Sequence, residues 1–467
     1  MPESAGDRSN AGQGQHAGPI PERGGDFTGP LQSGSDKAFK RIFWLLLAAY
    51  VMAYLDRINV SFANLTMASD LGLSTVMFGV ANSAFSLAYA LFEIPSNLAL
   101  ARFGGRVWIP RIMITWGIAS CMTMLAVGPY SFYALRFLVG AAEAGMVPGS
   151  ILFLSYWFTG KQNARANGML ILGMPIALVI GAPLSGAILL MDGMLGLQGW
   201  QWLFLLEGLP SVALGIIAYR VFDDSPANAK WLTPAEREAL EVNLARERAA
   251  AEAAAAVTRE HKVRWRDLWT REFVLLVGIY VCCTANNNII GSWAPLFVRE
   301  FLGNTDKVFL IGLVTGIVPA AALVVVPLWI FSANRHGSRL LHLSVALGAC
   351  AVGWIGITLV PNPVAKMAFL TMVSAAGISS VAVYWGTAVP YLHPNARPAA
   401  IAAISTFGLI GSIAHPSIIG VLRDWTGDFN SSFWYVALLD IIGVGMLVAL
   451  ASATRVRKAR EAAIRLA

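Results

Sequence analysis

The chain has 467 residues, of which 56% are hydrophobic and only 13% are charged. Because a typical soluble domain carries about 25% charged residues, this composition excludes an ordinary soluble domain and predicts a protein that lies in a lipid bilayer. The net charge of +7 does not indicate a nucleic-acid partner, since the lysines and arginines stand in short clusters between apolar runs, as they do in the cytoplasmic loops of membrane proteins.

Residues 1–36 are rich in glycine, proline, serine and charge, and they lack the apolar core of a signal peptide. We expect this segment to be a disordered cytoplasmic tail. The cysteines lie in or at the edges of apolar runs, so neither a disulfide framework nor a zinc site is expected. No cofactor and no metal are expected either. The four cysteines are Cys121, Cys282, Cys283 and Cys350.

Twelve apolar stretches follow, each close to the roughly 20 residues that span the hydrocarbon core of a membrane. A polar connection at 222–271 divides them into six and six, which predicts an all-α membrane protein with halves at 37–221 and 272–454. The approximate spans are 42–64, 76–100, 108–128, 131–153, 166–190, 201–221, 273–296, 308–331, 339–360, 364–388, 399–421 and 432–453.

Basic residues gather in alternate loops, whereas the loops around Asp70, Gly128 and Asp192 hold almost none. Cytoplasmic loops carry the excess of lysine and arginine, so both termini are predicted to be cytoplasmic, including a basic tail at 455–467. The residues behind this prediction are Lys37, Lys40, Arg41, Arg102, Arg106, Lys161, Arg165, Arg335, Arg339, Arg455, Arg457, Lys458 and Arg460.

Two local patterns describe the organisation further. Thr233-Pro234-Ala235-Glu236 has the form of a helix capping box and predicts a surface helix to about Ala256 within the polar connection. The pattern Arg-x-Gly-x-Arg occurs at 102–106 and again at 335–339, at matching places in the two halves. Its recurrence favours an internal duplication, which many secondary transporters show.

Four of the ionisable residues inside the apolar runs stand out: Asp56, Arg57, Arg136 and Glu143. Each costs about 2.5–3.5 kcal/mol to insert, so each needs a function or a partner. Asp56 and Arg57 point about 100° apart on a helix and must find partners across the bundle. Arginine suits an organic acid, and a carboxylate in a low dielectric can take up a proton. We therefore assign substrate binding to the arginines and proton coupling to the acids; purely structural ion pairs are the alternative.

Other polar and aromatic positions give weaker signals of a substrate path. Tyr89 and Glu93 lie four residues apart and share a helix face. Three successive amides interrupt one apolar run, and amides at membrane depth are costly unless they face a wet cavity. Structural packing is the alternative in each case. The candidates are Tyr89, Glu93, Asn286, Asn287, Asn288, Trp293, Tyr384, Trp385 and His415.

With these motifs in order, the chain resembles the major facilitator superfamily, and more specifically its anion:cation symporter family. The carrying segments are Tyr54–Asn59, Glu93–Asn97, Arg111–Gly117, Arg136-Phe137, Glu143–Gly145, Pro148-Gly149 and Trp202–Pro210. The chain departs from the family where Ala101 and Asn334 stand in place of the usual acids, and where His415 precedes Pro416.

The resemblance implies a twelve-helix carrier of the bacterial inner membrane that imports a small organic anion with protons by alternating access. Tartrate, sugar acids and aromatic acids form the implied substrate class, and a monomer is expected. An anion uniporter or exchanger of the same fold and a non-transporting membrane sensor remain alternatives. A membrane enzyme is disfavoured, because no catalytic triad, metal-ligand or phosphate-loop pattern is present.

Overall fold

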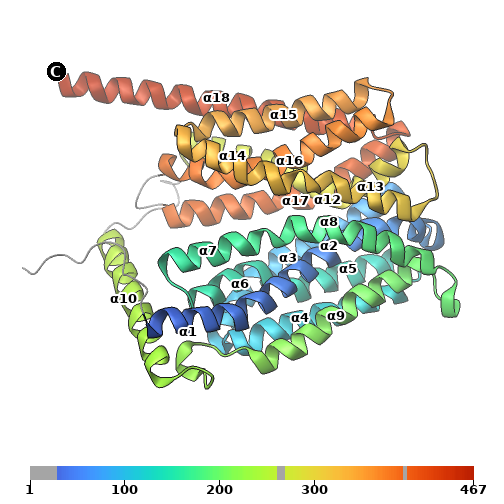
Figure 1. Ribbon diagram of the computed structural model, residues 1–467. Helices are drawn as coiled ribbons and strands as arrows, with labels where there is room; N and C mark the ends of the chain where they lie inside the picture. The colour runs from blue at the N-terminus through green and yellow to red at the C-terminus, as the bar shows by residue number, and fades with distance from the viewer. Residues whose placement is uncertain (1–28, 260–268, 393–396, 467) are drawn as a thin grey trace, which may run out of the picture.

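The computed structural model describes residues 29–259, 269–392 and 397–466, and nearly all of them are helical (Figure 1). Within these ranges, twelve helical segments are long and apolar enough to cross a membrane. The predicted all-α architecture with twelve spans in two halves is therefore confirmed. Several helices extend a turn or more beyond the apolar stretch that predicted them.

The first half contains six spans, two of which are interrupted. The fourth span changes direction between α5 and α6, and the fifth is divided between α7 and α8. The helices of this half are α1 (Pro30–Ala38), α2 (Trp44–Leu71), α3 (Thr75–Phe103), α4 (Gly105–Met122), α5 (Pro129–Glu143), α6 (Met146–Ser155), α7 (Gly160–Ile171), α8 (Gly173–Ile188) and α9 (Gly199–Val221).

The second half also contains six spans, and its second span is divided between α13 and α14. Its boundaries carry ordinary capping signals: the side chain of Thr270 caps α12, and that of Asn362 caps α16. The helices are α12 (Arg271–Phe301), α13 (Val308–Ala320), α14 (Ala322–His336), α15 (Arg339–Leu359), α16 (Pro363–Ala388), α17 (Arg397–Thr426) and α18 (Asn430–Leu466).

The connection between the halves contains helix α10 (Pro234–Arg259), which lies at the same end of the bundle as α1 and the end of α18 (Figure 1). Its capping box is formed: Thr233 Oγ1 accepts from the Glu236 backbone at 3.3 Å, and Glu236 Oε2 accepts from the Thr233 backbone at 3.0 Å. We call this end of the molecule the terminal side and the opposite end the far side.

The expected disordered tail is shorter than 36 residues, because residues 30–36 belong to α1. This short helix is held by α10: Ser33 and Lys37 both donate to the buried carboxylate of Glu236, at 2.6 and 2.9 Å. Gly34 also lies closely against Leu240 of α10. Residues 1–28 lie outside the described part of the chain.

The repeated arginine loops bind different partners in the two halves. In the first half, Arg106 donates its backbone N–H to Asp224 at 2.8 Å, and its guanidinium lies 3.9 Å from Asp223. In the second half, Arg339 donates to the side chain of Asn334 at 2.9 Å. The neutral amide of Asn334 therefore serves as the acceptor for the arginine of this loop.

The two halves meet closely on the far side through small residues. A Cβ atom built at Gly79 of α3 would lie 2.5 Å from the Pro416 carbonyl of α17. One built at Gly312 of α13 would lie 2.6 Å from the Ala182 carbonyl of α8. Since real side chains do not tolerate such distances, glycine is needed for these helices to approach. The far side is closed by backbone-to-backbone contact.

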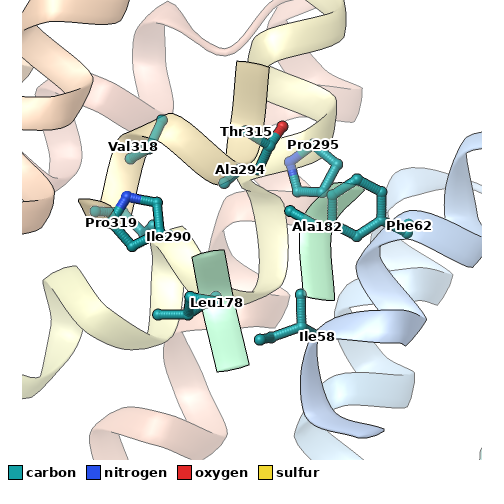
Figure 2. A pocket seen from close by; sticks show the side chains of 11 residues that line it. Ile58, Phe62, Leu178, Ala182, Ile290, Ala294, Pro295, Thr315, Val318 and Pro319 are labelled. Atoms are coloured by element: carbon teal, nitrogen blue, oxygen red, sulfur yellow. The ribbon is translucent and has the colours of Figure 1, made fainter. Parts of the chain in front are cut away.

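Between the halves, just inside this closure, lies a small apolar cavity of about 20 Å³ (Figure 2). This volume has room for about one water molecule. Ile58 and Phe62 of α2 form one wall, and Thr315 of α13 supplies a hydroxyl that has no hydrogen-bond partner within the described residues. We call the apolar layer around this small cavity, with Ile58 and Phe62 in its wall, the dry seal.

A wider and more polar pocket of about 330 Å³ lies further along α2, where both halves contribute to its wall. Leu65, Asp70 and Arg299 line it, and Arg299 reaches across from the second half to donate to the Leu65 carbonyl at 3.3 Å. Along α2 towards the far side, the dry seal therefore comes first and the polar pocket follows it.

The contact between α1 and α10 gives a pH-dependent prediction. Hydrogen bonding from Lys37, assisted by Ser33, lowers the pKa of Glu236 from its ordinary 4.5 to about 2. A lowered pKa means that the ionised form stabilises the contact above pH 4.5, and that this contribution disappears as the pH falls towards 2.

We expect Glu236→Gln to speed hydrogen exchange of the α1 backbone by about two- to fivefold at pH 7, in line with a partly exposed ion pair. The difference from the wild type should shrink as the pH is lowered from 4.5 towards 2. Hydrogen-exchange mass spectrometry measures both effects, and the exposed Glu241→Gln on the same helix is the control. Equal exchange in the wild type and Glu236→Gln at pH 7 would contradict the assignment.

Candidate functional site

The centre of the first half contains an ion pair between two distant helices. Arg57 of α2 donates through Nε to Glu143 Oε1 of α5 at 2.7 Å, and its Nη2 lies 2.6 Å from the same oxygen. The Glu143 side chain is fully buried, whereas that of Arg57 is 27% exposed. The anchor is therefore accessible, while its counter-ion is enclosed.

A break in the fourth span places Glu143 at this position. Helix α5 ends at Glu143, Gly145 adopts φ +88°, and α6 begins at Met146. A side chain at Gly145 would meet Ser96 Oγ at 2.5 Å, so both the backbone conformation and the space require glycine. The glutamate thus lies at a helix end and not in the middle of a continuous helix.

Arg136, two turns before Glu143 on α5, is only 3% exposed. Its guanidinium carbon lies 4.5 Å from the centre of the Phe85 ring, and Arg57 stacks over the same ring at 5.7 Å. The Arg136 Nε has no hydrogen-bond acceptor within the described residues. The charge of this buried guanidinium is therefore opposed by an aromatic face and by the electrostatic effect of Glu143 and Asp56, while its Nε stays without an acceptor.

Aromatic rings line the accessible side of the cluster. Arg57 lies 4.8 Å from the Tyr89 ring and 5.2 Å from the Tyr54 ring, distances at which a cation is attracted to an aromatic face. Glu93, one turn beyond Tyr89, is partly buried and within electrostatic reach of Arg57. From the second half, Tyr280 lies close enough to Tyr54 and Glu93 to interact with both.

The predicted pair of Tyr89 and Glu93 therefore lies beside Arg57. We name Arg57, Arg136, Glu143, Tyr89 and Glu93 the arginine cluster from here on.

Asp56 points away from this cluster and into the first half. Its carboxylate accepts hydrogen bonds from Trp116 at 2.6 Å, Ser120 at 2.9 Å, Asn59 at 3.2 Å and Ser211 at 3.3 Å. The residue is 2% exposed. Sequence neighbours on one helix thus serve two separate polar networks, as their angular separation predicted.

The three successive amides of α12 each bind a different neighbouring helix. Asn286 donates to Asp440 of α18 at 2.8 Å and accepts from Trp354 of α15 at 2.7 Å. Asn287 donates to the Gly377 carbonyl of α16 at 3.2 Å, and Asn288 donates to Ser412 of α17 at 2.8 Å. Their contacts hold the second half together, so the structure does not bring Asn286 and Asn287 to the arginine cluster.

The remaining candidates lie in packed surroundings. Trp293 is fully buried on the far side, where it packs edge-on against Phe78 of the first half at 5.1 Å. Tyr384 is buried and donates to the Leu276 carbonyl at 2.7 Å. His415 shares a hydrogen bond of 2.9 Å with the Tyr435 hydroxyl, and its Nε2 has no partner within the described ranges.

Several residues of the polar networks had no sequence prediction. Trp116, Ser120 and Ser211 hold Asp56, and Ser185 donates to Glu207 at 2.9 Å. One sequence feature could have indicated these networks: a tryptophan occurs in the third membrane span of each half, on α4 and on α15. Trp116 and Trp354 both donate to a polar side chain on the first helix of their own half, Asp56 and Asn286 respectively.

Comparison with known proteins agrees with this architecture. The model of the Major Facilitator Superfamily matches residues 46–391. An Agrobacterium vitis protein named "Putative tartrate transporter" is 38% identical over 405 residues, which cover 86% of this chain and 91% of that protein. A "Quinolone resistance transporter" of Acinetobacter baumannii is 34% identical over 405 residues, covering 85% and 90% of the two chains.

Among solved structures, a bacterial homolog of the human lysosomal transporter Spinster, in an inward-facing and occupied conformation, shares the fold with a TM-score of 0.70 at 15% identity. The match covers 91% of this chain and 98% of that one. The chain therefore belongs to the Major Facilitator Superfamily, and it is a multi-pass membrane transporter and not an enzyme.

Proposed function

We propose that this protein imports a small organic anion together with protons by alternating access. The observation that carries the proposal is the incomplete hydrogen bonding of the buried Arg136 guanidinium. Glu143 contacts Arg57, and the buried Nε of Arg136 has no acceptor among the described residues. A buried charge without a partner is costly, so an anionic ligand would complete the site.

A carboxylate is the anion that fits this chemistry best. The planar guanidinium offers two parallel donors, which match the two oxygens of a carboxylate. Tyr54, Tyr89 and Phe85 enclose the arginines with aromatic surface, which suits the carbon skeleton of a small organic acid. The similar Agrobacterium vitis protein is named "Putative tartrate transporter". We propose tartrate and similar carboxylic acids as the substrate class of this protein.

Glu143 is the acid best placed to couple protons to this anion. Its only ion-pair partner among the described residues is Arg57. A proton on Glu143 would remove the charge that holds Arg57 and free the guanidinium for the substrate. Asp56 is proposed as the second coupling acid, since it precedes Arg57 in the chain and its carboxylate is buried.

We further propose that the terminal side faces the cytoplasm and that the protein works as a monomer in the inner membrane. The basic clusters of the loops support this orientation. The far side then faces outwards, and its closure by Gly79, Gly312 and the dry seal corresponds to an inward-facing state. A uniporter or exchanger of the same fold differs only in coupling, which a protonophore distinguishes.

The first prediction concerns the two anchors. A lysine lacks the planar fork that grips a carboxylate, so Arg57→Lys and Arg136→Lys should each lower tartrate uptake at least about tenfold, equivalent to the loss of about 1.4 kcal/mol of binding. Uptake of radiolabelled tartrate into cells at matched expression measures this.

Arg111→Lys is the control, because Arg111 lies outside the cluster and stacks on Trp108. Normal uptake by either cluster variant would remove that arginine from the site.

The second prediction concerns coupling. Neutral amides resemble protonated acids in shape, so Asp56→Asn and Glu143→Gln should abolish accumulation driven by an inward proton gradient while exchange of labelled for unlabelled tartrate survives. Proteoliposomes with an imposed gradient, with and without a protonophore, measure both modes. Undiminished gradient-driven accumulation in the double variant, or wild-type uptake that ignores the protonophore, would rule out the mechanism.

A further inference from the structure

A third buried acid of the first half, Glu207 of α9, plays no part in the mechanism above. It is 2% exposed and lies at the meeting point of α2, α8 and α9. Ser185 of α8 donates to its Oε1 at 2.9 Å, and the amide of Asn59 of α2 lies between it and Asp56. Its other oxygen, Oε2, has no hydrogen-bond partner within the described residues.

The neighbouring acids Asp56 and Glu207 differ in the number of hydrogen bonds that their carboxyl groups accept. Asp56 accepts four hydrogen bonds from side chains, which suits an ionised carboxylate. Glu207 accepts one directed hydrogen bond and leaves one oxygen buried without a donor. The two acids lie in one polar network, so ionising both would place two negative charges together in a low dielectric. The arrangement favours an ionised Asp56 and a neutral Glu207.

The surroundings of Glu207 offer no other charge compensation in the part of the chain that the structure describes. The titratable groups that face this network are Asp56 of α2 and Cys121 of α4, whose thiol donates to the Leu205 carbonyl at 3.8 Å, and Glu143 and Arg136 of α5 act electrostatically on Asp56. Arg57 is next to Asp56 in sequence but binds Glu143. No lysine, arginine or histidine contacts Glu207 among the described residues.

A proton fits this network better than a metal cation does. The four donors around Asp56 direct N–H and O–H hydrogens towards its oxygens, and these hydrogens would repel a cation. A proton on Glu207 Oε2 instead turns an unpaired acceptor into a donor. Asn59 Oδ1, a second buried oxygen without a donor in the described ranges, supplies an acceptor in the same network.

The position of Ser185 links this proton to the movement of the two halves. The next residue, Gly186, lies at the contact between α8 and α13, where its Cβ would be 3.0 Å from the Val308 carbonyl and 3.2 Å from Gly312 Cα. Opening of the far side must separate these helices. The helix that carries the hydrogen-bond donor of Glu207 is therefore one of the two that separate when the contact opens.

From this geometry we propose that Glu207 is an additional proton-binding site of the transport cycle, protonated while the far side is closed and exchanging its proton when α8 and α13 separate. Protonation takes one proton from solution and changes the carboxylate from −1 to neutral; no other bond forms or breaks. This inference rests on the proposed proton-coupled transport and adds a proton site outside the arginine cluster.

The test compares Glu207→Gln with the wild type and with Asp440→Asn. Asp440 is the matched control: it is fully buried, it accepts from Asn286, and it lies on α18, within the second half. In proteoliposomes, Glu207→Gln should retain tartrate exchange and lose gradient-driven accumulation to near the level of simple equilibration. Asp440→Asn should keep both modes of transport.

Infrared spectroscopy gives a direct second measurement on the purified proteins. A protonated Glu207 contributes a carbonyl band of a buried carboxylic acid, which should change with bath pH in the wild type and in Asp440→Asn. The same band should be missing from Glu207→Gln. A structural role alone would not produce a band that follows the bath pH.

The outcomes separate this inference from the proposed function. Wild-type accumulation that ignores the proton gradient would overturn the proposed symport and, with it, the role of Glu207. A coupled wild type together with normal accumulation by Glu207→Gln would overturn the role of Glu207 alone. If the variant loses both transport modes, a pH-dependent carboxylic acid band that it lacks supports the inference, and a wild type without such a band refutes it.

Discussion

The ion pair between Arg57 and Glu143 is the interaction on which the organisation of the first half depends. It joins α2 to α5 at membrane depth, where an unpaired charge of either sign would be costly. It requires the fourth span to end a helix at Glu143, which in turn requires glycine at 145. Arg136 lies on the same helix as Glu143, and its buried Nε has no acceptor among the described residues, so the proposed anion would complete its hydrogen bonding.

Each half contains a buried polar network of the same layout, but the two networks differ in charge. In each, the first helix presents a polar side chain that accepts an indole N–H from the third helix and shares its network with an acid on the sixth. The first half uses Asp56 with Trp116 and Glu207, whereas the second uses Asn286 with Trp354 and Asp440. An internal duplication, predicted from the arginine loops, accounts for this correspondence. An amide in place of Asp56 leaves the second network with one acid fewer.

The sequence was sufficient to predict the twelve spans, because apolar length is a local property. It also singled out Arg57, Arg136 and Glu143, since charges within apolar runs are conspicuous. The partners of Asp56 could not be predicted, because serine and tryptophan are common in membrane helices and their direction depends on helix rotation and packing. For the same reason Asn286 was expected near the substrate, whereas it binds Asp440 and Trp354. The break at Gly145 had a visible signal in Gly145 and Pro148, but in the sequence these residues contributed only to the family resemblance.

The three successive amides of α12 have a consequence for how the two halves can change in evolution. Asn286, Asn287 and Asn288 attach one helix to four others through hydrogen bonds, whereas the centre of the first half is joined by the ion pair between Arg57 and Glu143. Changes at partly exposed aromatic residues of the second half, such as Tyr280 and Trp385, therefore leave this ion pair in place. A transporter built in this way can vary one half in evolution while the charged network of the other half stays intact.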